Sequence, residues 1–426
     1  MRKVAIIDGC RTPFVKAGGK FAALSALDLG KSCVTELINR TEINASDIGE
    51  IVYGVAIAKP SVPNIAREIA LAIGLPKTIP AHTVQMACAT SLRTAAIAAL
   101  SIALGENQLA IAGGAESLSD LPITVSEPFR KLVLEANTKK SQQEAMYTLL
   151  QAKLQDLLPQ PMTIAEPYTG LTMGEHCELM NRQWSVSRSE QDEYALRSHA
   201  LAALAIADGR IPAELFPVYA PPDYIPVVED DIVRKTEDRE KVTSLKPVFD
   251  PDYGTVTAAN SSPLTDGAAA LLLADEEYAK AHGYRPKAYI KAWAFSGLDP
   301  DDGLLLGPVY ATAKLLERTG LSLAEIDLIE MHEAFAGQVL CNLKAFASTD
   351  FARKKLGRSS ALGEIPLERL NVCGGSIALG HPFAATGARM LTSLASEMAR
   401  REARYGLATA CAAGALGASI LLEREQ

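Results

Sequence analysis

The chain has 426 residues, of which 48% are hydrophobic and 22% charged, a composition typical of globular proteins and a length sufficient for about two to four domain-sized units. Its formal net charge is −8, from 42 basic and 50 acidic side chains, and no Lys/Arg-rich run stands out, which argues against sequence-independent binding of nucleic acid. Residues 1–8 are typical of a buried strand and lack a signal-peptide core, and we find no apolar run of the ~18 residues that a membrane span needs.

Seven cysteines are spread thinly along the chain: Cys10, Cys33, Cys88, Cys177, Cys341, Cys373 and Cys411. An odd number without paired spacing argues against a disulfide framework, and no CxxC pair with a histidine partner indicates zinc. We therefore expect a cytoplasmic protein that works in a reducing compartment and has no metal site.

Strand-like apolar runs alternate with longer helical stretches, which predicts an α/β fold with largely buried sheets. Three segments recur in the same order: 47–53 resembles 325–331, 109–114 resembles 407–412, and 267–273 resembles 417–422. Chance similarity between Ala/Gly-rich strands is the alternative, but three matches in order favour duplication. We predict an N-terminal half (1–118 and 247–284), an insertion (119–246) and a C-terminal half (285–426).

Two capped helices are predicted within the insertion. Ser141 and Glu144 have capping-box spacing, and the helix that follows should run to residue 158, where Pro159 stops it. Its apolar face consists of Met146, Leu149, Leu150, Leu154, Leu157 and Leu158. A second capping box at 187–190 opens a helix that should end near Gly209.

Cys88 lies between a strand-like segment (82–84) and an Ala-rich helical stretch (92–104). This position is at or near a helix N-terminus, where free amides and the macrodipole stabilise a thiolate. A lone cysteine is more often a small buried packing residue. The strand–turn–helix context here favours a nucleophile.

A cysteine nucleophile needs a base, and His381 lies in a Gly-flanked turn that matches the place of Cys88 in the other half. His332 follows the predicted strand 328–331, and Cys411 lies at a third strand end. If the two halves face each other, these strand ends could converge on one pocket, although a satisfied core imidazole remains the alternative for either histidine. We interpret the other histidines as structural or surface residues: His82, His176, His199 and His282.

These motifs resemble the four catalytic motifs of the thiolase family, in the family's order and approximate spacing. The matches are Cys88 in QMACATS, His332 in HEAFA, His381 in GHPFAATGAR and Cys411 in CAAGALG, with further likeness at 11–14 (RTPF) and 255–269. The resemblance covers nearly the whole chain. It implies a thiolase-like duplicated five-layer α/β/α/β/α fold with an inserted helical loop domain.

The resemblance also implies an acyltransferase, in which Cys88 carries the acyl group, His381 is its base and Cys411 is a second acid/base. One oxyanion site would use His381 with a water held by His332, and the other would use the backbone amides of Cys88 and Ala413. Ser262 and Met173 would line the pantetheine channel, the latter residue with plain core packing as an equal alternative. Coenzyme A is a substrate here, so no cofactor is expected.

The His332 form of the motif and the long insertion are similar to 3-ketoacyl-CoA thiolases of the fatty-acid beta-oxidation multienzyme type. That likeness implies thiolytic cleavage of 3-ketoacyl-CoA to acetyl-CoA and a shortened acyl-CoA. It also implies a homodimer, a possible enoyl-CoA hydratase/3-hydroxyacyl-CoA dehydrogenase partner subunit and possible peripheral membrane contact through 128–158. Two departures are Ala415, where such enzymes usually have Gly, and Cys373, where Asn or Gly is common.

Three alternatives stay open at this point. A biosynthetic acetoacetyl-CoA thiolase is disfavoured by His332 and the long insertion. A ketoacyl-synthase-like condensing enzyme would pair a cysteine with two histidines but would lack the acidic Cys411. A non-catalytic acyl-CoA carrier would be expected to lose Cys88 or His381, and both are present.

Overall fold

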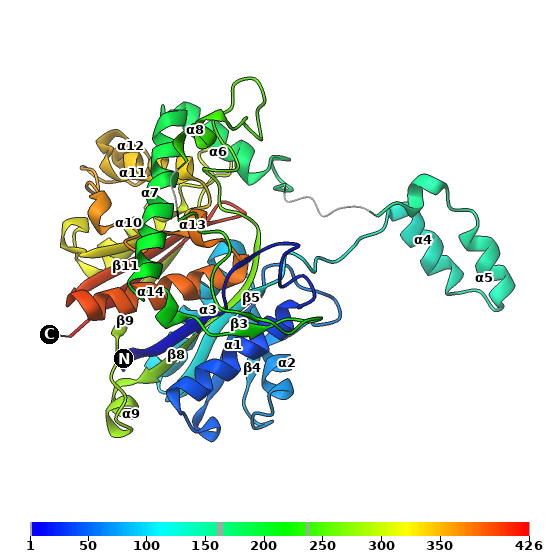
Figure 1. The fold of residues 1–426 in the computed structure, drawn as a ribbon, viewed down its shortest axis with the longest axis horizontal. Coiled ribbons are helices and arrows are strands. Elements are labelled where there is room, and N and C mark those ends of the chain that lie inside the picture. Colours follow the sequence, from blue (N-terminus) through cyan, green and yellow to red (C-terminus); the bar gives the residue numbers. More distant parts are fainter. Residues whose placement is uncertain (1, 160–164, 236–237, 426) are drawn as a thin grey trace. The chain divides into compact units, whose positions relative to one another are not determined.

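Ten strands form one continuous sheet in the computed structural model, which describes residues 2–159, 165–235 and 238–425 (Figure 1). Across the sheet the order is β10 (Leu328–Met331), β11 (Tyr405–Ala412), β12 (Leu416–Glu423), β9 (Ala288–Gly297), β1 (Val4–Arg11), β8 (Thr265–Asp275), β5 (Leu109–Glu116), β3 (Glu50–Gly54) and β4 (Ala81–Val84), with β2 (Val15–Lys16) beside β8. The predicted strand 328–331 is confirmed, and the α/β class is as predicted.

The two halves of the sheet share one pairing pattern. In the first, β3 is parallel to β5, β5 is antiparallel to β8, and β8 is antiparallel to β1. In the second, β10, β11, β12 and β9 repeat those relations in the same order. The three recurring sequence segments therefore fall on equivalent strands, and a short antiparallel pairing of β1 with β9 joins the halves. The exact boundaries of the predicted halves and insertion stay a prediction.

Helices cover both faces of the sheet, as the arrangement of the apolar residues requires (Figure 1). The outer helices are α1 (Ala26–Thr41) and α2 (Ile65–Ala72) on the first half, and α10 (Gly307–Thr319) and α11 (Ala336–Ala347) on the second. Between the halves lie α3 (Thr90–Leu104) and α14 (Thr386–Arg401), which pack on each other and share one hydrophobic core with strands from both halves. Shorter helices are α9 (Glu276–Ala281), α12 (Thr349–Lys355) and α13 (Ser376–Leu379).

The expectation that no apolar segment is long enough to span a membrane is wrong for one helix. The helical segment Ala87–Leu104 is long and apolar enough to cross a membrane by length and composition, with a mean hydropathy of 1.6. However, 67% of that window is buried inside the protein. Since α3 shares a hydrophobic core with strands of both halves and with α14, its apolar character is that of a core helix.

The part of the predicted insertion after residue 165 packs with the two halves in one compact unit. It contains α6 (Met173–Gln183), α7 (Arg188–Ala207), α8 (Arg239–Ser244) and a small hairpin of β6 (Val218–Tyr219) with β7 (Pro226–Val227). Ser187 and Glu190 form the predicted capping box of α7, and Gly209 follows the helix with φ +85°. A buried bidentate pair, Arg11 with Asp230 at 2.7 and 2.8 Å, ties this segment to β1.

Residues Leu121–Ala165 form a separate compact unit with α4 (Glu127–Ala136) and α5 (Gln142–Leu149). Ser141 caps α5, but the predicted single helix to residue 158 is wrong, since α5 ends at Leu149 and a separate 3₁₀ turn spans Leu154–Leu157. The Asp156 carboxylate accepts from the Lys153 backbone N–H (3.2 Å), which starts the new turn. Residues 160–164 and 236–237 of the predicted insertion, and residues 1 and 426 at the chain ends, lie outside the described residues.

Candidate active site

Cys88 lies in a 3₁₀ turn, Ala87–Ala89, between β4 and α3. Ala87 has φ +44°, a conformation that costs a non-glycine residue roughly 1–3 kcal/mol and is often retained at functional sites. The Thr90 hydroxyl holds the turn by accepting from Met86 N–H (2.8 Å) and donating to the Ala87 carbonyl (2.7 Å). The thiol is therefore presented just before α3, in the strand–turn–helix setting expected from the sequence.

Cys88, His332 and His381 converge. The Cys88 Sγ and one ring nitrogen of each histidine lie within 4.8 Å of one another. The two imidazole rings are 4.1 Å apart between centroids, at an angle of 42°. The structure thus brings together three side chains from both halves of the fold: Cys88 from the turn after β4, His332 from the end of β10, and His381 from the loop after α13.

His381 is held by its Nδ1, which lies 2.6 Å from the Thr386 hydroxyl. That hydroxyl also lies 3.2 Å from the Pro382 carbonyl, to which it donates, so Nδ1–H can donate to Thr386 and leave a lone pair on Nε2. The Nε2 atom is buried and has no hydrogen-bond partner among the described residues. Burial, followed by the charge of Arg389, lowers the pKa of His381 to about 3, which keeps the imidazole neutral.

His332 follows β10 directly, and its backbone N–H donates to the Thr409 carbonyl of β11 (2.9 Å). Its Nδ1 lies 2.9 Å from the Ser376 hydroxyl, and its Nε2 is buried without a partner among the described residues. Burial, then His381 and Arg389, hold the pKa of His332 well below its ordinary value. Both histidines therefore aim a free nitrogen into the site as neutral rings.

Cys411 and Ala413 come from the end of β11 and the loop after it. Cys411 is 1% exposed, and burial followed by the neighbouring Cys88 holds the pKa of its thiol well above the ordinary value. The Ala413 backbone N–H hydrogen-bonds the Cys88 thiol and favours its charged form. In the same loop the Gly414 N–H donates to Glu166 Oε1 (2.7 Å), and Ala415 adopts φ +55°.

The resting state of Cys88 differs from the expected thiolate. Burial raises the pKa of Cys88 to about 12, and the backbone N–H groups of Ala413 and Cys88 itself offset only part of that effect. The amides at the start of the helix are therefore not enough to ionise the thiol at neutral pH. A base must take the proton as the thiol reacts, and His381 carries the free nitrogen that can do so.

Glu333, the residue after His332, was assigned no role from the sequence. It is fully buried. Its carboxylate accepts hydrogen bonds from the Tyr194 hydroxyl (2.9 Å), the Ser198 hydroxyl (2.8 Å), the Asn371 amide (2.7 Å) and the Ile377 N–H (3.2 Å). These bonds fasten α7 to the loop that leads to His381. Its place in the HEAFA motif was the available signal.

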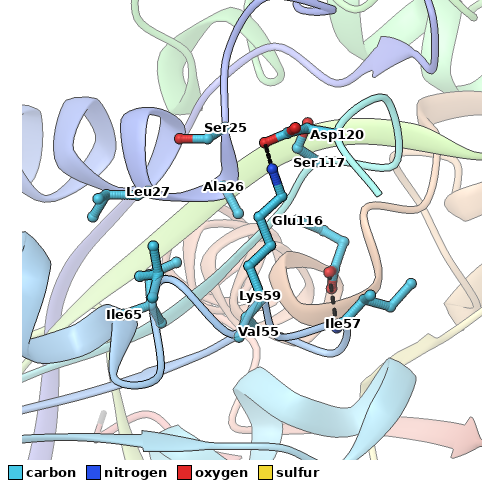
Figure 2. Close-up of a pocket in the computed structure, with 11 residues that line it drawn as sticks. Ser25, Ala26, Leu27, Val55, Ile57, Lys59, Ile65, Glu116, Ser117 and Asp120 are labelled. Carbon is cyan, nitrogen blue, oxygen red and sulfur yellow. Dashed lines mark hydrogen bonds and ion pairs between the residues drawn. The ribbon is translucent and has the colours of Figure 1, made fainter. Parts of the chain in front are cut away.

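Glu116 at the end of β5 is a second buried carboxylate with no distinguishing motif in the sequence. Oε2 accepts from Ala56 N–H (2.9 Å) and Ala384 N–H (3.2 Å), and Oε1 accepts from Ile57 N–H (3.0 Å). It borders a cavity of about 30 Å³, about the room one water needs, over which Lys59 and Asp120 form an ion pair (Figure 2). Since Ala384 lies three residues after His381, Glu116 joins the first half to the His381 loop.

The two predicted pantetheine-contacting residues differ in their placement. The Ser262 N–H donates to the Ala334 carbonyl (2.9 Å), and nearby Leu264 forms a bridge with His381, so this loop lies beside both histidine loops. Met173 is the first residue of α6, half-buried, and packs against the hydrophobic core of the second half. Contact of either residue with coenzyme A stays a prediction.

Cys88, His332 and His381 are also a set of groups that could ligate a metal ion. These atoms lie within 4.8 Å of one another, and a tetrahedral zinc site would bind each of them at about 2.0–2.3 Å. The arrangement suits a pocket that receives a reacting group between a thiol and two imidazoles. The absence of a metal remains an expectation from the sequence.

Comparison with known proteins gives consistent matches along the chain. Residues 4–277 match the family "Thiolase, N-terminal domain", and residues 284–424 match "Thiolase, C-terminal domain". The chain is 48% identical to the 3-ketoacyl-CoA thiolase of Aeromonas salmonicida (strain A449), over 99% of this chain and 97% of that protein. It is 47% identical to the 3-ketoacyl-CoA thiolase of Yersinia pestis (strain Pestoides F), with the same coverage.

Solved structures match the fold as well. The Bacillus anthracis acetyl-CoA acetyltransferase superposes with a TM-score of 0.85 at 32% identity and covers 99% of both chains. The human mitochondrial 3-ketoacyl-CoA thiolase in complex with CoA superposes with a TM-score of 0.83 at 28% identity, over 100% of this chain and 98% of that one. The duplicated fold expected from the sequence motifs is therefore confirmed.

Proposed function

Because this chain belongs to the thiolase family, we propose that it cleaves 3-ketoacyl-CoA with CoA to give acetyl-CoA and a shortened acyl-CoA. The convergence of the Cys88 thiol with the free nitrogens of His332 and His381, next to Cys411, carries the proposal. The 48% identity to a 3-ketoacyl-CoA thiolase over nearly the full chain supports this substrate class, and with it a role in beta-oxidation.

In the first half-reaction, His381 Nε2 takes the proton of Cys88 as its sulfur attacks the 3-keto carbon. The bond between the second and third carbons breaks, and the electron pair leaves as the enolate of acetyl-CoA. Cys411 gives its proton to that carbanion, and Cys88 keeps the shortened acyl group as a thioester. The raised pKa of the Cys411 thiol suits an acid that stays protonated until the carbanion forms.

In the second half-reaction, Cys411 takes the proton of the CoA thiol, which attacks the acyl group on Cys88. The Cys88 sulfur leaves and recovers its proton from His381. Negative charge develops on a thioester oxygen in both steps and needs donors in place beforehand. We assign one set to His381 with a water held by His332, and the other to the backbone amides of Cys88 and Ala413.

We assign the binding of CoA to the loop of Ser262 and to a cavity of about 240 Å³ lined in part by His199, Arg234 and Lys235. Arg234 backbone N–H donates to His199 Nδ1 (3.2 Å), and burial lowers the pKa of His199 to about 4, so the cations of the cavity are the Arg and Lys side chains. Asp238 is a carboxylate in the same lining. The two cations suit the anionic nucleotide end of CoA.

We propose a homodimer in the cytoplasm. β4 is at the end of the sheet, and Leu100 and Leu104 on α3 are 42% and 61% exposed, which leaves an apolar strip for a second copy to cover. The seven unpaired cysteines suit a reducing compartment. Light scattering of the purified protein tests the dimer, since a monomer at micromolar concentration contradicts it.

We propose that the Leu121–Ala165 unit binds a membrane or an enoyl-CoA hydratase/3-hydroxyacyl-CoA dehydrogenase subunit. Leu150 and Leu154 are 69% and 81% exposed. Arg130 pairs with Glu127 (2.7 Å), and Lys139 pairs with Glu135 (2.7 Å), so part of the positive charge of this unit is already neutralised. The exposed apolar side chains therefore support binding more than the basic ones do. Changing both leucines to Glu should abolish liposome or subunit association with short-chain turnover retained; loss of folding contradicts the proposal.

The thiolase proposal is tested by CoA-dependent cleavage of short-, medium- and long-chain 3-ketoacyl-CoAs, with mass spectrometry of the acylated enzyme. We expect cleavage of medium or long chains and an acyl group on Cys88. Turnover of acetoacetyl-CoA alone would favour the acetyl-CoA acetyltransferase activity named for the Bacillus anthracis protein. Cys88→Ala that still turns over would refute the mechanism.

A further inference from the structure

Ser376 is a fully buried residue at the first position of α13 that has two polar neighbours. Arg389 Nη2 lies 3.3 Å from its Oγ, and His332 Nδ1 lies 2.9 Å from the same atom. A guanidinium can only donate, so Ser376 accepts from Arg389. The serine proton then has one acceptor among the described residues, which is His332 Nδ1.

The direction of the hydrogen bond between Ser376 and His332 decides which ring nitrogen of the neutral His332 carries the proton. If Nδ1–H donated to Ser376 instead, the serine would bury an unpaired donor at a cost of roughly 1–3 kcal/mol. The lower-energy arrangement has Ser376 donating to Nδ1, which leaves the single proton of the neutral ring on Nε2. His381 differs, because the Thr386 hydroxyl has the Pro382 carbonyl as a second acceptor and Nδ1 can keep its proton.

Arg389 is itself held in place. It is 1% exposed and forms a buried ion pair with Glu330 of β10. Glu330 lies two residues before His332, which directly follows this strand. The guanidinium is thereby fixed beside Ser376, and it cannot serve as a proton acceptor that would reverse the serine hydrogen bond.

We propose that Ser376, held by Arg389, is a positioning residue that keeps His332 in the tautomer with its proton on Nε2. His332 is then a hydrogen-bond donor to the water or substrate oxygen in the site, while His381 Nε2 keeps the lone pair of a base. The pocket therefore contains one donor nitrogen, on His332, and one acceptor nitrogen, on His381. This inference rests on the proposed function, because it assigns the donor to the oxyanion of the thiolase reaction.

The test is a double-mutant cycle of Ser376→Ala in the natural chain and in the His332→Asn background. Without the serine, His332 can place its proton on Nδ1, so we expect a fall in kcat of about tenfold or more, the size of one lost hydrogen bond of moderate strength. An asparagine amide is a donor in every state. In the His332→Asn background we therefore expect Ser376→Ala to change kcat by less than about twofold.

Thermal unfolding of all four proteins separates a folding defect from an effect on the site. If Ser376→Ala lowers kcat by the same factor in both backgrounds, the serine has a general structural role and the inference is overturned. A wild-type enzyme that neither turns over nor acylates Cys88 refutes the proposed function instead. Nitrogen-15 NMR of the histidine rings, with His332→Asn as the assignment control, gives a readout independent of activity. A wild-type His332 protonated on Nδ1 overturns the inference.

Discussion

Glu116 makes the pH dependence of stability predictable. Burial, which outweighs three backbone N–H bonds, raises the pKa of Glu116 from 4.5 to about 7. At 1.36 kcal/mol per pH unit, this difference corresponds to ~3 kcal/mol. The native protein binds this proton more tightly than the unfolded chain, so the stabilisation is fully present below pH 4.5 and is lost as the pH rises to about 7.

Glu116→Gln removes this titration and replaces one acceptor oxygen by an NH₂ group. At pH 5 we expect the variant to be less stable than wild type, by roughly 1–3 kcal/mol for one unsatisfied backbone N–H. At pH 8 the deficit should shrink or reverse by ~3 kcal/mol, because only wild type then carries a buried charge.

Urea unfolding of both proteins at the two pH values measures this change. Glu325→Gln is the control, since the Ser322 backbone N–H lowers the pKa of that exposed carboxyl and any trend should have the opposite sign. Parallel stability curves for wild type and Glu116→Gln would refute the reasoning.

Three further predictions concern the site. Alkylation of Cys88 by iodoacetamide should precede that of the other cysteines and keep rising with pH well above neutrality, because its pKa is raised to about 12; a plateau near pH 7 by peptide mass spectrometry would contradict this. Cys411→Ser should still acquire an acyl group from a saturated acyl-CoA yet lose ~10²–10⁴ in carbon–carbon cleavage, whereas His381→Ala should fail at acylation too; identical defects in both variants in rapid-quench assays would refute separate roles. Ala415→Gly should raise stability by up to ~1 kcal/mol, since φ is +55° there, while Ala412→Gly in β11 should lower it by roughly 0.5–1 kcal/mol; equal losses in thermal unfolding would show no backbone strain.

Ser262 can be tested by kinetics. Ser262→Ala should raise the KM for CoA more than it lowers kcat, and Arg234→Gln should do the same if the cavity holds the nucleotide end. Lys20→Gln, a change of a solvent-exposed cation, is the control. An unchanged KM in both site variants would contradict the binding assignments.

The fold was predictable because its signals are local or repeated. The β3 and β10 segments follow similar polar turns and end where the chain meets the site, so internal similarity alone indicated equivalent strands. The end of α5 at Leu149, in place of the expected helix to residue 158, was not predictable in the same way. The helical spacing of apolar residues continues past Leu149, but the hydrogen bond from the Lys153 N–H to the Asp156 carboxylate starts a new turn. The spacing of apolar residues does not reveal that this local hydrogen bond replaces the continued helix.

The residues of the site also divide into those with a local sequence signal and those whose role depends on contacts distant in sequence. Cys88, His332 and Cys411 lie at or just after the ends of β4, β10 and β11, and strand ends of one sheet meet at predictable edges. His381 instead follows the short helix α13, and its motif was the signal that identified it. Ser376 and Glu116 act through hydrogen bonds to residues distant in sequence, and a buried serine or glutamate has no pattern that distinguishes it. The protonation of Cys88 was also out of reach, since burial and helix amides oppose each other and only their geometry decides the balance.

The seam between the halves has a consequence for synthesis of the protein. β1 is translated long before its partners, since Val4 pairs with Asp275 on one side and with Ile290 on the other. Until both partners have been made, an apolar strand with two unpaired edges waits in a growing chain, and such edges are prone to aggregation. The edge of β1 that faces the second half therefore stays unpaired until residues 288–290 have been translated, and such long-range pairing is of the kind that slows folding.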